Sequence, residues 1–202
     1  MAAHAARSAR ADVTGAVLAG GQGRRVNGRD KGLMLLSGKP LVEWVCGRLH
    51  AQAAAVLICA NRNAARYAAY GQVIADPSAD FRGPLAGIAA ALGACETAWL
   101  LTVPVDSPAI PNDLVRRLAE NVAQGEAAVT VAHDGERRQP LFALYRRDLA
   151  VSARSALEED LPVWRWQDEC GATEVDFSDQ AGAFANLNSV EQFHDWELHR
   201  HG

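Results

Sequence analysis

The first half of the chain alternates short apolar runs with stretches of helical spacing. Four of these runs are rich in small and β-branched residues and have the length of buried strands. They are residues 14–19, 54–60, 72–75 and 98–103. Strands that alternate with helices indicate a three-layer α/β fold around a mostly parallel central sheet.

Helical spacing follows each run. Pro40 precedes Leu41, Val45 and Leu49 at i, i+4 and i+8, which predicts a helix with proline in its first turn. Further helices are expected through Arg66 and Tyr67, from Pro84 to about Leu92, and from Pro111 with Leu114, Leu118 and Val122 on one face.

The second half is less regular. Residues 127–133 and 140–145 flank the turn Asp134-Gly135, so we expect two antiparallel strands at the edge of the sheet. Ser189 and Gln192 form a capping box that predicts a last helix carrying Phe193 and Trp196. The tryptophans Trp99, Trp164 and Trp166 are expected to pack in the core or at its edge.

Composition narrows the class of protein. The 202 residues lack a polar linker, which predicts one domain over residues 14–202, preceded by a disordered extension over residues 1–13. A net charge of −4 argues against nucleic-acid binding, and no apolar run has the ~18 residues of a membrane span. The four scattered cysteines signal neither a zinc site nor a disulfide framework, so a reduced, cytoplasmic protein is expected.

The most informative segment is the glycine-rich stretch 18–31, which leaves the first predicted strand where open α/β sheets bind ligands. Glycines there allow backbone N–H groups to approach phosphate oxygens. Its spacing fits neither of two familiar loops. Gly28 is not followed by the Lys-Ser/Thr pair of a Walker A loop, and Val26 stands where a dinucleotide fingerprint needs its third glycine.

This segment resembles the amino-terminal signature of the molybdenum cofactor guanylyltransferases, with Leu-Ala-Gly-Gly at 18–21, Asp-Lys-Gly-Leu at 30–33 and Gly-Lys-Pro-Leu at 38–41. The likeness continues in the family's order over most of residues 14–197. It is carried by residues 60–63, Asp76, 82–88, 104–108, 133–140, 175–179 and 184–193. The resemblance implies a Rossmann-like nucleotidyltransferase fold.

The chain departs from the family pattern in three places. Val26 stands where the family usually has Met, and Val105 replaces a common Cys. Cys59 takes a place where at least some relatives carry a nucleotide-binding Asn, which makes the nearby Asn61 a candidate for that role.

The resemblance also implies roles for individual residues. Those expected to bind the nucleotide are Leu18, Ala19, Gly20, Gly21, Lys31, Asn61, Asp76 and Asp106. Arg25, Lys31 and Asp106 are the implied catalytic residues, with Asp106 as the ligand of Mg²⁺. Arg137, Asn186 and Asn188 are candidates for the acceptor side or for support of the site.

The implied reaction joins GMP from GTP to the terminal phosphate of molybdopterin and releases pyrophosphate. Because the attacking phosphate is already ionised, the site needs positioning and charge neutralisation rather than a serine, cysteine or histidine. GTP and molybdopterin are the expected partners, together with other proteins of cofactor biosynthesis or molybdoenzyme maturation.

Two other functions remain open at this point. A molybdenum cofactor cytidylyltransferase would use CTP on the same acceptor, but those relatives carry Leu-Ala-Ala-Gly where this chain has Leu-Ala-Gly-Gly at 18–21. A protein that binds the nucleotide and delivers the cofactor without catalysis would not require the metal site, so the presence of both Lys31 and Asp106 favours an enzyme.

Overall fold

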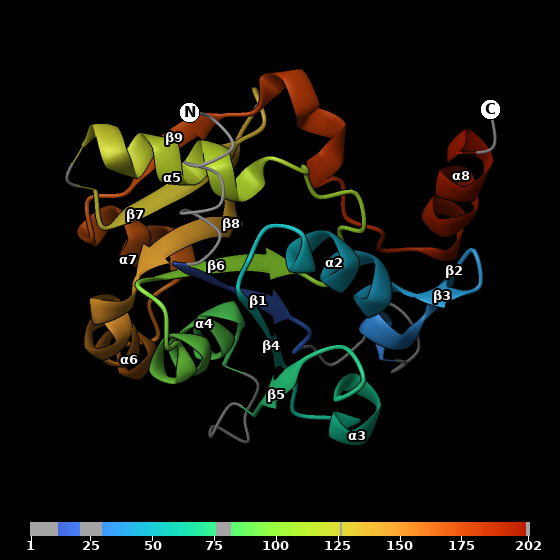
Figure 1. The fold of residues 1–202 in the computed structure, drawn as a ribbon, viewed down its shortest axis with the longest axis horizontal. Helices are drawn as coiled ribbons and strands as arrows, with labels where there is room; N and C mark the ends of the chain where they lie inside the picture. The colour runs from blue at the N-terminus through green and yellow to red at the C-terminus, as the bar shows by residue number, and fades with distance from the viewer. Residues whose placement is uncertain (1–11, 21–29, 76–81, 126, 201–202) are drawn as a thin grey trace.

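The computed structural model describes residues 12–20, 30–75, 82–125 and 127–200. In this part of the chain a seven-stranded sheet has the order β5-β4-β1-β6-β8-β7-β9 (Figure 1). Its strands are β1 (Val13–Leu18), β4 (Ala55–Cys59), β5 (Gln72–Ile74), β6 (Trp99–Pro104), β7 (Val129–His133), β8 (Arg138–Arg146) and β9 (Thr173–Asp176). Only β8 runs antiparallel to its neighbours. A separate ladder pairs β2 (Leu35–Leu36) with β3 (Lys39–Pro40).

Helices cover both faces of the sheet, which makes three layers (Figure 1). The described helices are α2 (Leu41–His50), α3 (Ala64–Tyr67), α4 (Pro84–Ala94), α5 (Leu114–Gln124), α6 (Ala150–Glu158), α7 (Val163–Glu169) and α8 (Val190–Arg200). The same described residues also form the 3₁₀ segments η2 (Lys31–Leu33), η3 (Arg147–Leu149) and η4 (Ser178–Phe184). Side chains of α2 and α5 belong to the apolar cluster on one face, and those of α4, α6 and α7 to the cluster on the other.

The central strand β1 shows why the apolar runs form strands. Val13 and Val17 face the cluster of α2 and α5, while Ala16 and Leu18 face the cluster of α4. All six residues of β1 are buried. A parallel strand covered on both faces has no polar side, so it reads as a continuous apolar run rather than as an alternation.

The predicted strands of the first half are confirmed to within one residue at each end. The helix expected from Pro111 is also present, but it begins three residues later, at Leu114. The backbone N–H of Leu114 donates to Pro111 O at 3.4 Å, so the proline lies in the turn that leads into the helix.

The antiparallel pairing of β7 with β8 is confirmed, but its predicted place at the edge of the sheet is wrong. Strand β8 lies between β6 and β7, and β9 covers the far side of β7. The reason is visible in β8 itself: Phe142 and Leu144 enter one apolar cluster, whereas Ala143 and Tyr145 enter the other. A strand that is apolar on both faces must lie inside a sheet.

The last helix has the predicted capping box. The Ser189 backbone N–H donates to Gln192 Oε1 at 3.1 Å, and the Gln192 backbone N–H donates to Ser189 Oγ at 3.4 Å. Helix α8 packs through Phe193 on a small cluster with Leu36, and Trp196 meets Trp44 edge-on at 5.5 Å.

The three tryptophans of the middle and second half differ in exposure. Trp166 is buried and Trp99 is half-buried, as expected, but Trp164 is 53% exposed and lies outside the core. Among the described residues, no helix combines the length and the apolar character that a bilayer crossing requires.

Candidate active site

The carboxyl ends of the parallel strands meet at one edge of the sheet. Beyond β1, the Ala19 N–H donates to Cys59 O at 3.0 Å, and the Val105 N–H donates to Leu18 O at 3.2 Å. These bonds continue the ladder past the strand ends, so the turns after β1, β4 and β6 start side by side. Ligands of open α/β sheets bind at such an edge.

Lys31 and Asp106 meet at this edge. Lys31 is the first residue of η2, and Asp106 follows β6 by two residues. The Lys31 ammonium donates to Asp106 Oδ2 at 2.6 Å and to Asn188 Oδ1 at 2.7 Å. The side chains of Lys31 and Asp106 are 20% and 19% exposed, so the pair is partly desolvated yet remains open to a ligand.

The second oxygen of Asp106 is buried and, among the described residues, has no hydrogen-bond partner. A buried carboxylate oxygen without a donor is costly. A divalent cation would satisfy this oxygen while Lys31 still neutralises Oδ2. The described residues contain no group of three His, Cys, Asp or Glu side chains that could hold a metal alone. Asp106 therefore fits Mg²⁺, which binds through one or two carboxylates together with substrate phosphates.

The segment between η4 and α8 (residues 185–189), here called the η4–α8 linker, completes the site. The Leu187 N–H donates to Asp106 O at 2.8 Å, and the buried Ser107 hydroxyl donates to Asn186 Oδ1 at 2.6 Å. Asn188 binds Lys31 through its side chain. Asn186 and Asn188, both expected near the site, thus lie against the Asp106 turn.

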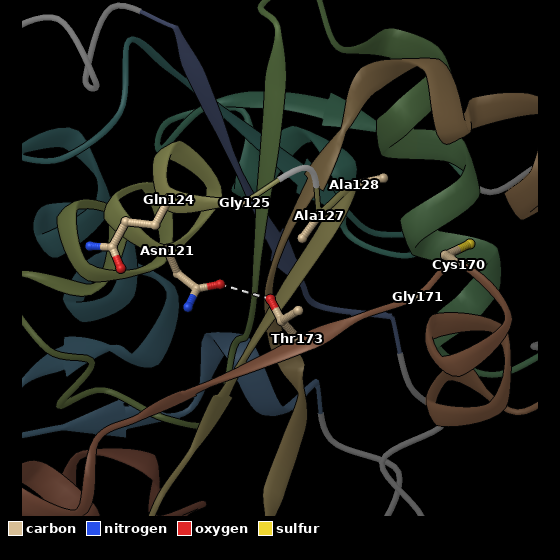
Figure 2. Close-up of a pocket in the computed structure, with 8 residues that line it drawn as sticks. All are labelled: Asn121, Gln124, Gly125, Ala127, Ala128, Cys170, Gly171 and Thr173. Atoms are coloured by element: carbon tan, nitrogen blue, oxygen red, sulfur yellow. Dashed lines mark hydrogen bonds between the residues drawn. The ribbon is translucent and has the colours of Figure 1, made fainter.

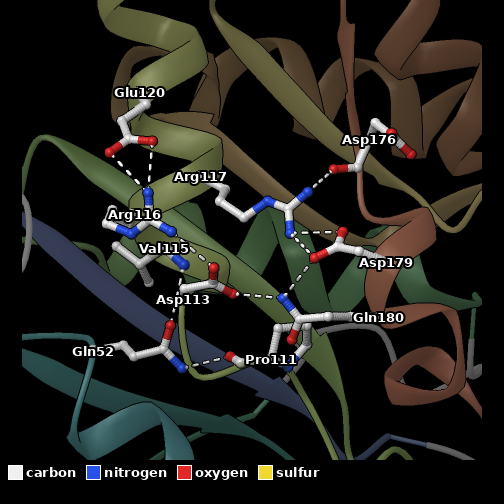
Figure 3. A network of polar contacts seen from close by, with 10 residues as sticks. All are labelled: Gln52, Pro111, Asp113, Val115, Arg116, Arg117, Glu120, Asp176, Asp179 and Gln180. Carbon is white, nitrogen blue, oxygen red and sulfur yellow. Dashed lines mark hydrogen bonds and ion pairs between the residues drawn. The ribbon is translucent and has the colours of Figure 1, made fainter.

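A polar network holds the start of η4 against α5 (Figure 3). The guanidinium of Arg117 donates to both carboxylate oxygens of Asp179 at 2.9 and 3.0 Å and also to Asp176 O. Its Cζ lies 4.0 Å from the centre of the buried Phe177 ring. Gln180 donates to Asp113 Oδ1 at 3.1 Å. These contacts fix the chain shortly before it enters the η4–α8 linker.

Other predicted residues lie at different points of the same edge. Leu18 is buried, Ala19 is half-buried, and Gly20 is exposed directly after β1. Asn61 is exposed beyond β4, whereas Cys59 is buried and its thiol donates to Gly87 O at 3.3 Å. Gly21, Arg25 and Asp76 lie outside the described residues.

Arg137 lies in the turn between β7 and β8, also at this edge, and is exposed. Asp134 organises that turn. Its Oδ1 accepts from the N–H groups of Glu136 and Arg137, and its Oδ2 accepts from the Gln139 amide. Burial works against its charge, but these bonds prevail and lower the pKa of Asp134. Arg138, by contrast, is turned to Asp168 on α7.

A second polar cluster, for which the sequence predicts no role, lies beside Lys31. The hydroxyl of Tyr67 donates to Asp30 Oδ1 at 2.5 Å, and the Asn63 amide donates to Asp30 Oδ2 at 2.8 Å. Burial, followed by the bond to Asp30, raises the pKa of Tyr67. The only hint in the sequence is the position of Asp30 directly before Lys31.

A cavity of about 490 Å³ lies at the opposite, amino edge of the sheet (Figure 2). Its walls include Asn121 and Gln124 from the end of α5, Cys170 after α7, and Thr173 at the start of β9. Thr173 Oγ1 donates to Asn121 Oδ1 at 2.7 Å. The described side chains that line it carry no charge, so this cavity offers nothing to hold a triphosphate.

The chain is similar to known proteins over most of its length. The model of the MobA-like NTP transferase domain matches residues 15–173. The chain is 44% identical to a molybdenum cofactor guanylyltransferase of Vibrio campbellii over 177 residues, which are 87% of this chain and 90% of that protein. A molybdenum cofactor guanylyltransferase of Cupriavidus metallidurans is 43% identical over 196 residues, with 92% and 94% covered.

Solved structures show the same fold at lower identity. Molybdopterin-guanine dinucleotide biosynthesis protein A from Archaeoglobus fulgidus superposes with a TM-score of 0.76 at 20% identity, covering 93% of this chain and 98% of that one. The 2-C-methyl-D-erythritol 4-phosphate cytidylyltransferase of Thermus thermophilus gives a TM-score of 0.68 at 16% identity, with 93% and 98% covered. The expected nucleotidyltransferase fold with a mostly parallel sheet is confirmed.

Proposed function

Because this chain belongs to the molybdenum cofactor guanylyltransferase family, we propose that it transfers GMP from GTP to the terminal phosphate of molybdopterin. The product is the guanine dinucleotide form of the cofactor, and pyrophosphate leaves. The observation that supports this function most directly is the contact of Lys31 with Asp106 and Asn188 at the carboxyl edge of the sheet.

The contact supplies both signs of charge that the reaction needs. The Lys31 ammonium is a compact cation suited to triphosphate oxygens, and it lies at the end of the segment that begins with Leu18 and Ala19. The Asp106 carboxylate offers one oxygen to Lys31, and its other oxygen, which is buried without a described partner, would bind a cation. One carboxylate can therefore orient the lysine and hold a metal at the same time.

Asp106 would hold Mg²⁺ in this proposal, and Asn188 would keep the Lys31 ammonium in place. When bound, Mg²⁺ supplies charge neutralisation for the phosphates that react. Lys31 and Arg25 would stabilise the triphosphate and the charge that develops on pyrophosphate, and Asp76 would help to hold the nucleoside. Since the acceptor phosphate is already an anion, these residues need not remove a proton.

The decisive experiment follows pyrophosphate release from GTP in the presence of molybdopterin and Mg²⁺. We expect release with GTP to exceed release with CTP or ATP, and chelation of the metal to abolish it. Preference for CTP would indicate a cytidylyltransferase. Tight GTP binding without any pyrophosphate release would indicate a protein that delivers the cofactor without catalysis.

A pair of lysine variants tests the residue assignment. Lys31→Ala should weaken GTP binding and transfer while leaving the fold intact, because a residue of a polar turn adds little to the core. Lys39→Ala is the matched control, since Lys39 is exposed and pairs only with Glu43 among the ion pairs of the described residues. Equal kinetics for the two variants would remove Lys31 from the site.

A further inference from the structure

Side chains of α3 and of the residue before it contact the turn that carries Lys31. Asp30 precedes Lys31, and its two carboxylate oxygens accept one bond each, from the Tyr67 hydroxyl and from the Asn63 amide. Tyr67 is 0% exposed, so its ring is fixed in the core and its hydroxyl has a defined position. The carboxylate of Asp30 is thus tied to the body of the protein.

The residue after Lys31 touches the same hydroxyl. A Cβ atom built on Gly32 would lie 2.4 Å from Tyr67 Oη and 2.9 Å from a methyl carbon of Val105. The backbone of η2 is therefore wedged between Tyr67 and the residue that precedes Asp106. Tyr67 contacts the chain on both sides of Lys31, and Val105 links the same turn to the Asp106 side of the site.

Asn63 reaches Asp30 from an unusual backbone conformation. Its φ of +53° lies in the left-handed region, which L-residues other than glycine seldom adopt and which asparagine tolerates better than most. The residue starts α3, and its carbonyl accepts from the N–H groups of Arg66 and Tyr67. Asn63 thereby ties the placement of Tyr67 to the placement of Asp30.

The charges of Asp30 and Lys31 suggest what the contacts of Tyr67 and Asn63 do. Asp30 and Lys31 are neighbours of opposite charge, yet the Lys31 ammonium bonds Asp106 and Asn188. Two neutral donors occupy the Asp30 oxygens, so this carboxylate does not compete for the ammonium. Groups that act on a reacting phosphate must be held in place, and an error of about 1 Å in such a group can cost ~10²-fold in rate.

We propose that Tyr67 and Asn63 are positioning residues of the transfer site, which act through the Asp30 carboxylate to set where Lys31 presents its ammonium to the nucleotide. This inference rests on the proposed function, because it takes Lys31 as the residue that binds the triphosphate. In this proposal Tyr67 and Asn63 act through Asp30 as positioning residues rather than as catalytic residues.

The test removes one donor at a time. Tyr67→Phe deletes the hydroxyl and keeps the ring, and Asn63→Gly deletes the amide and tolerates the positive φ. Tyr70→Phe, three residues further along, is the control, because the half-buried Tyr70 has no described hydroxyl bond. GTP binding in the presence of Mg²⁺ is measured in each variant and again in the Lys31→Ala background.

We expect Tyr67→Phe and Asn63→Gly each to weaken GTP binding by about tenfold, which is the lower end of the effect of losing a hydrogen bond that supports a metal ligand, taken here as the nearest comparison. Tyr70→Phe should bind GTP normally. In the Lys31→Ala background neither substitution should weaken binding further, because the group being positioned is gone. Losses that multiply in the double variants, or unchanged binding in the single variants, would overturn the proposal.

A measurement without substrate separates this proposal from the proposed function. Hydrogen exchange in the free protein should quicken at the N–H groups of Leu33 and Met34, which close the η2 turn, when Tyr67 becomes Phe. Exchange in α8 should not change. If exchange responds as expected but the wild type neither binds nor uses GTP, the proposed function fails and the positioning of the turn stands. Unchanged exchange overturns the positioning itself.

Discussion

Lys31 and Asp106 are 75 residues apart in the chain, yet the lysine ammonium lies 2.6 Å from one oxygen of the aspartate. The other oxygen of the same carboxylate is buried without a described partner. Among the described residues the aspartate is therefore only half satisfied, and its second oxygen is the one that the proposed Mg²⁺ would contact.

Asp106→Asn should lower the Mg²⁺-dependent rate by ~10²-fold or more, on the order of 3 kcal/mol, because the variant keeps the shape of the side chain and loses its charge. GTP affinity should fall less than the rate. The backbone carbonyl of Asp106 still accepts from Leu187, so the melting temperature should change little.

Asp113→Asn is the matched control for that substitution. Asp113 lies seven residues further along and pairs with Arg116 and Gln180, away from Lys31. Its neutralisation should affect stability slightly and leave turnover normal. A folded and fully active Asp106→Asn would remove the metal from this site, whatever the control does.

Arg117→Ala should lower the free energy of unfolding by about 1–2 kcal/mol. The variant loses the cation–π contact with Phe177 and the bond to Asp176 O, which together join α5 to the chain before η4. Chemical denaturation measures the loss, and Arg117→Lys should recover part of it. A variant as stable as the wild type would mean that the apolar packing of Phe177 and Phe184 holds this segment alone.

The ion pair between Arg117 and Asp179 predicts that the stability of the protein depends on pH. Hydrogen bonds from Arg117 lower the pKa of Asp179 below its usual value near 3.9. A carboxyl whose pKa is lowered by folding stabilises the protein above the pKa of the unfolded chain, and this contribution is lost as the pH falls through the folded pKa. Asp179→Asn should therefore melt earlier than the wild type at pH 7, and the difference should disappear once the pH falls below the folded pKa of Asp179. A difference that persists in acid would contradict this account.

Substitution by alanine should be favourable at Gly47, where it affects stability, and unfavourable at Gly32, where it affects GTP binding. Gly47 lies inside α2 with no atom within 4 Å of an added Cβ, so Gly47→Ala should raise the free energy of unfolding by about 0.5–1 kcal/mol. Gly32→Ala places its methyl group against the Tyr67 hydroxyl and should weaken GTP binding. Thermal melts and GTP titrations of both variants check the contrast, and a Gly32→Ala protein with normal affinity would show that η2 can shift freely.

The cysteines should differ in their rates of alkylation. Cys46 is buried, and burial raises the pKa of its thiol to about 12, so little thiolate exists at pH 8. Cys59 and Cys95 are also buried. Cys170 is half-buried, and burial raises its pKa as well. Peptide mapping after iodoacetamide treatment of the native protein should find Cys170 modified first and Cys46 only after unfolding.

The sequence was sufficient to locate the strands at the centre of the sheet, because each is apolar on both faces and ends in a turn. It did not place β8 inside the sheet. The short strand β9, whose residues are mostly exposed, lacks the apolar run that would distinguish it from a loop. Its pairing with β7 depends on packing that no local pattern encodes.

For the site, the chain order of strands and turns was enough to bring Lys31 and Asp106 to one edge. The contacts of Asn186 with Ser107 and of Asn188 with Lys31 span 79 and 157 positions. Contacts over such separations depend on the path of the η4–α8 linker, which local spacing does not predict. The hydrogen bond from Tyr67 to Asp30 was not predicted, because the pattern around a tyrosine on a short helix indicates only that its ring packs in the core.

The residues of the η4–α8 linker that contact the site follow the last strand of the sheet along the chain. Every strand of the sheet is present once the chain has been made as far as Asp176, but the amides that meet Lys31 and Ser107 come later. A fragment that stops short of Asn186 would contain every strand of the sheet but neither amide, so Lys31 would contact Asp106 without Asn188.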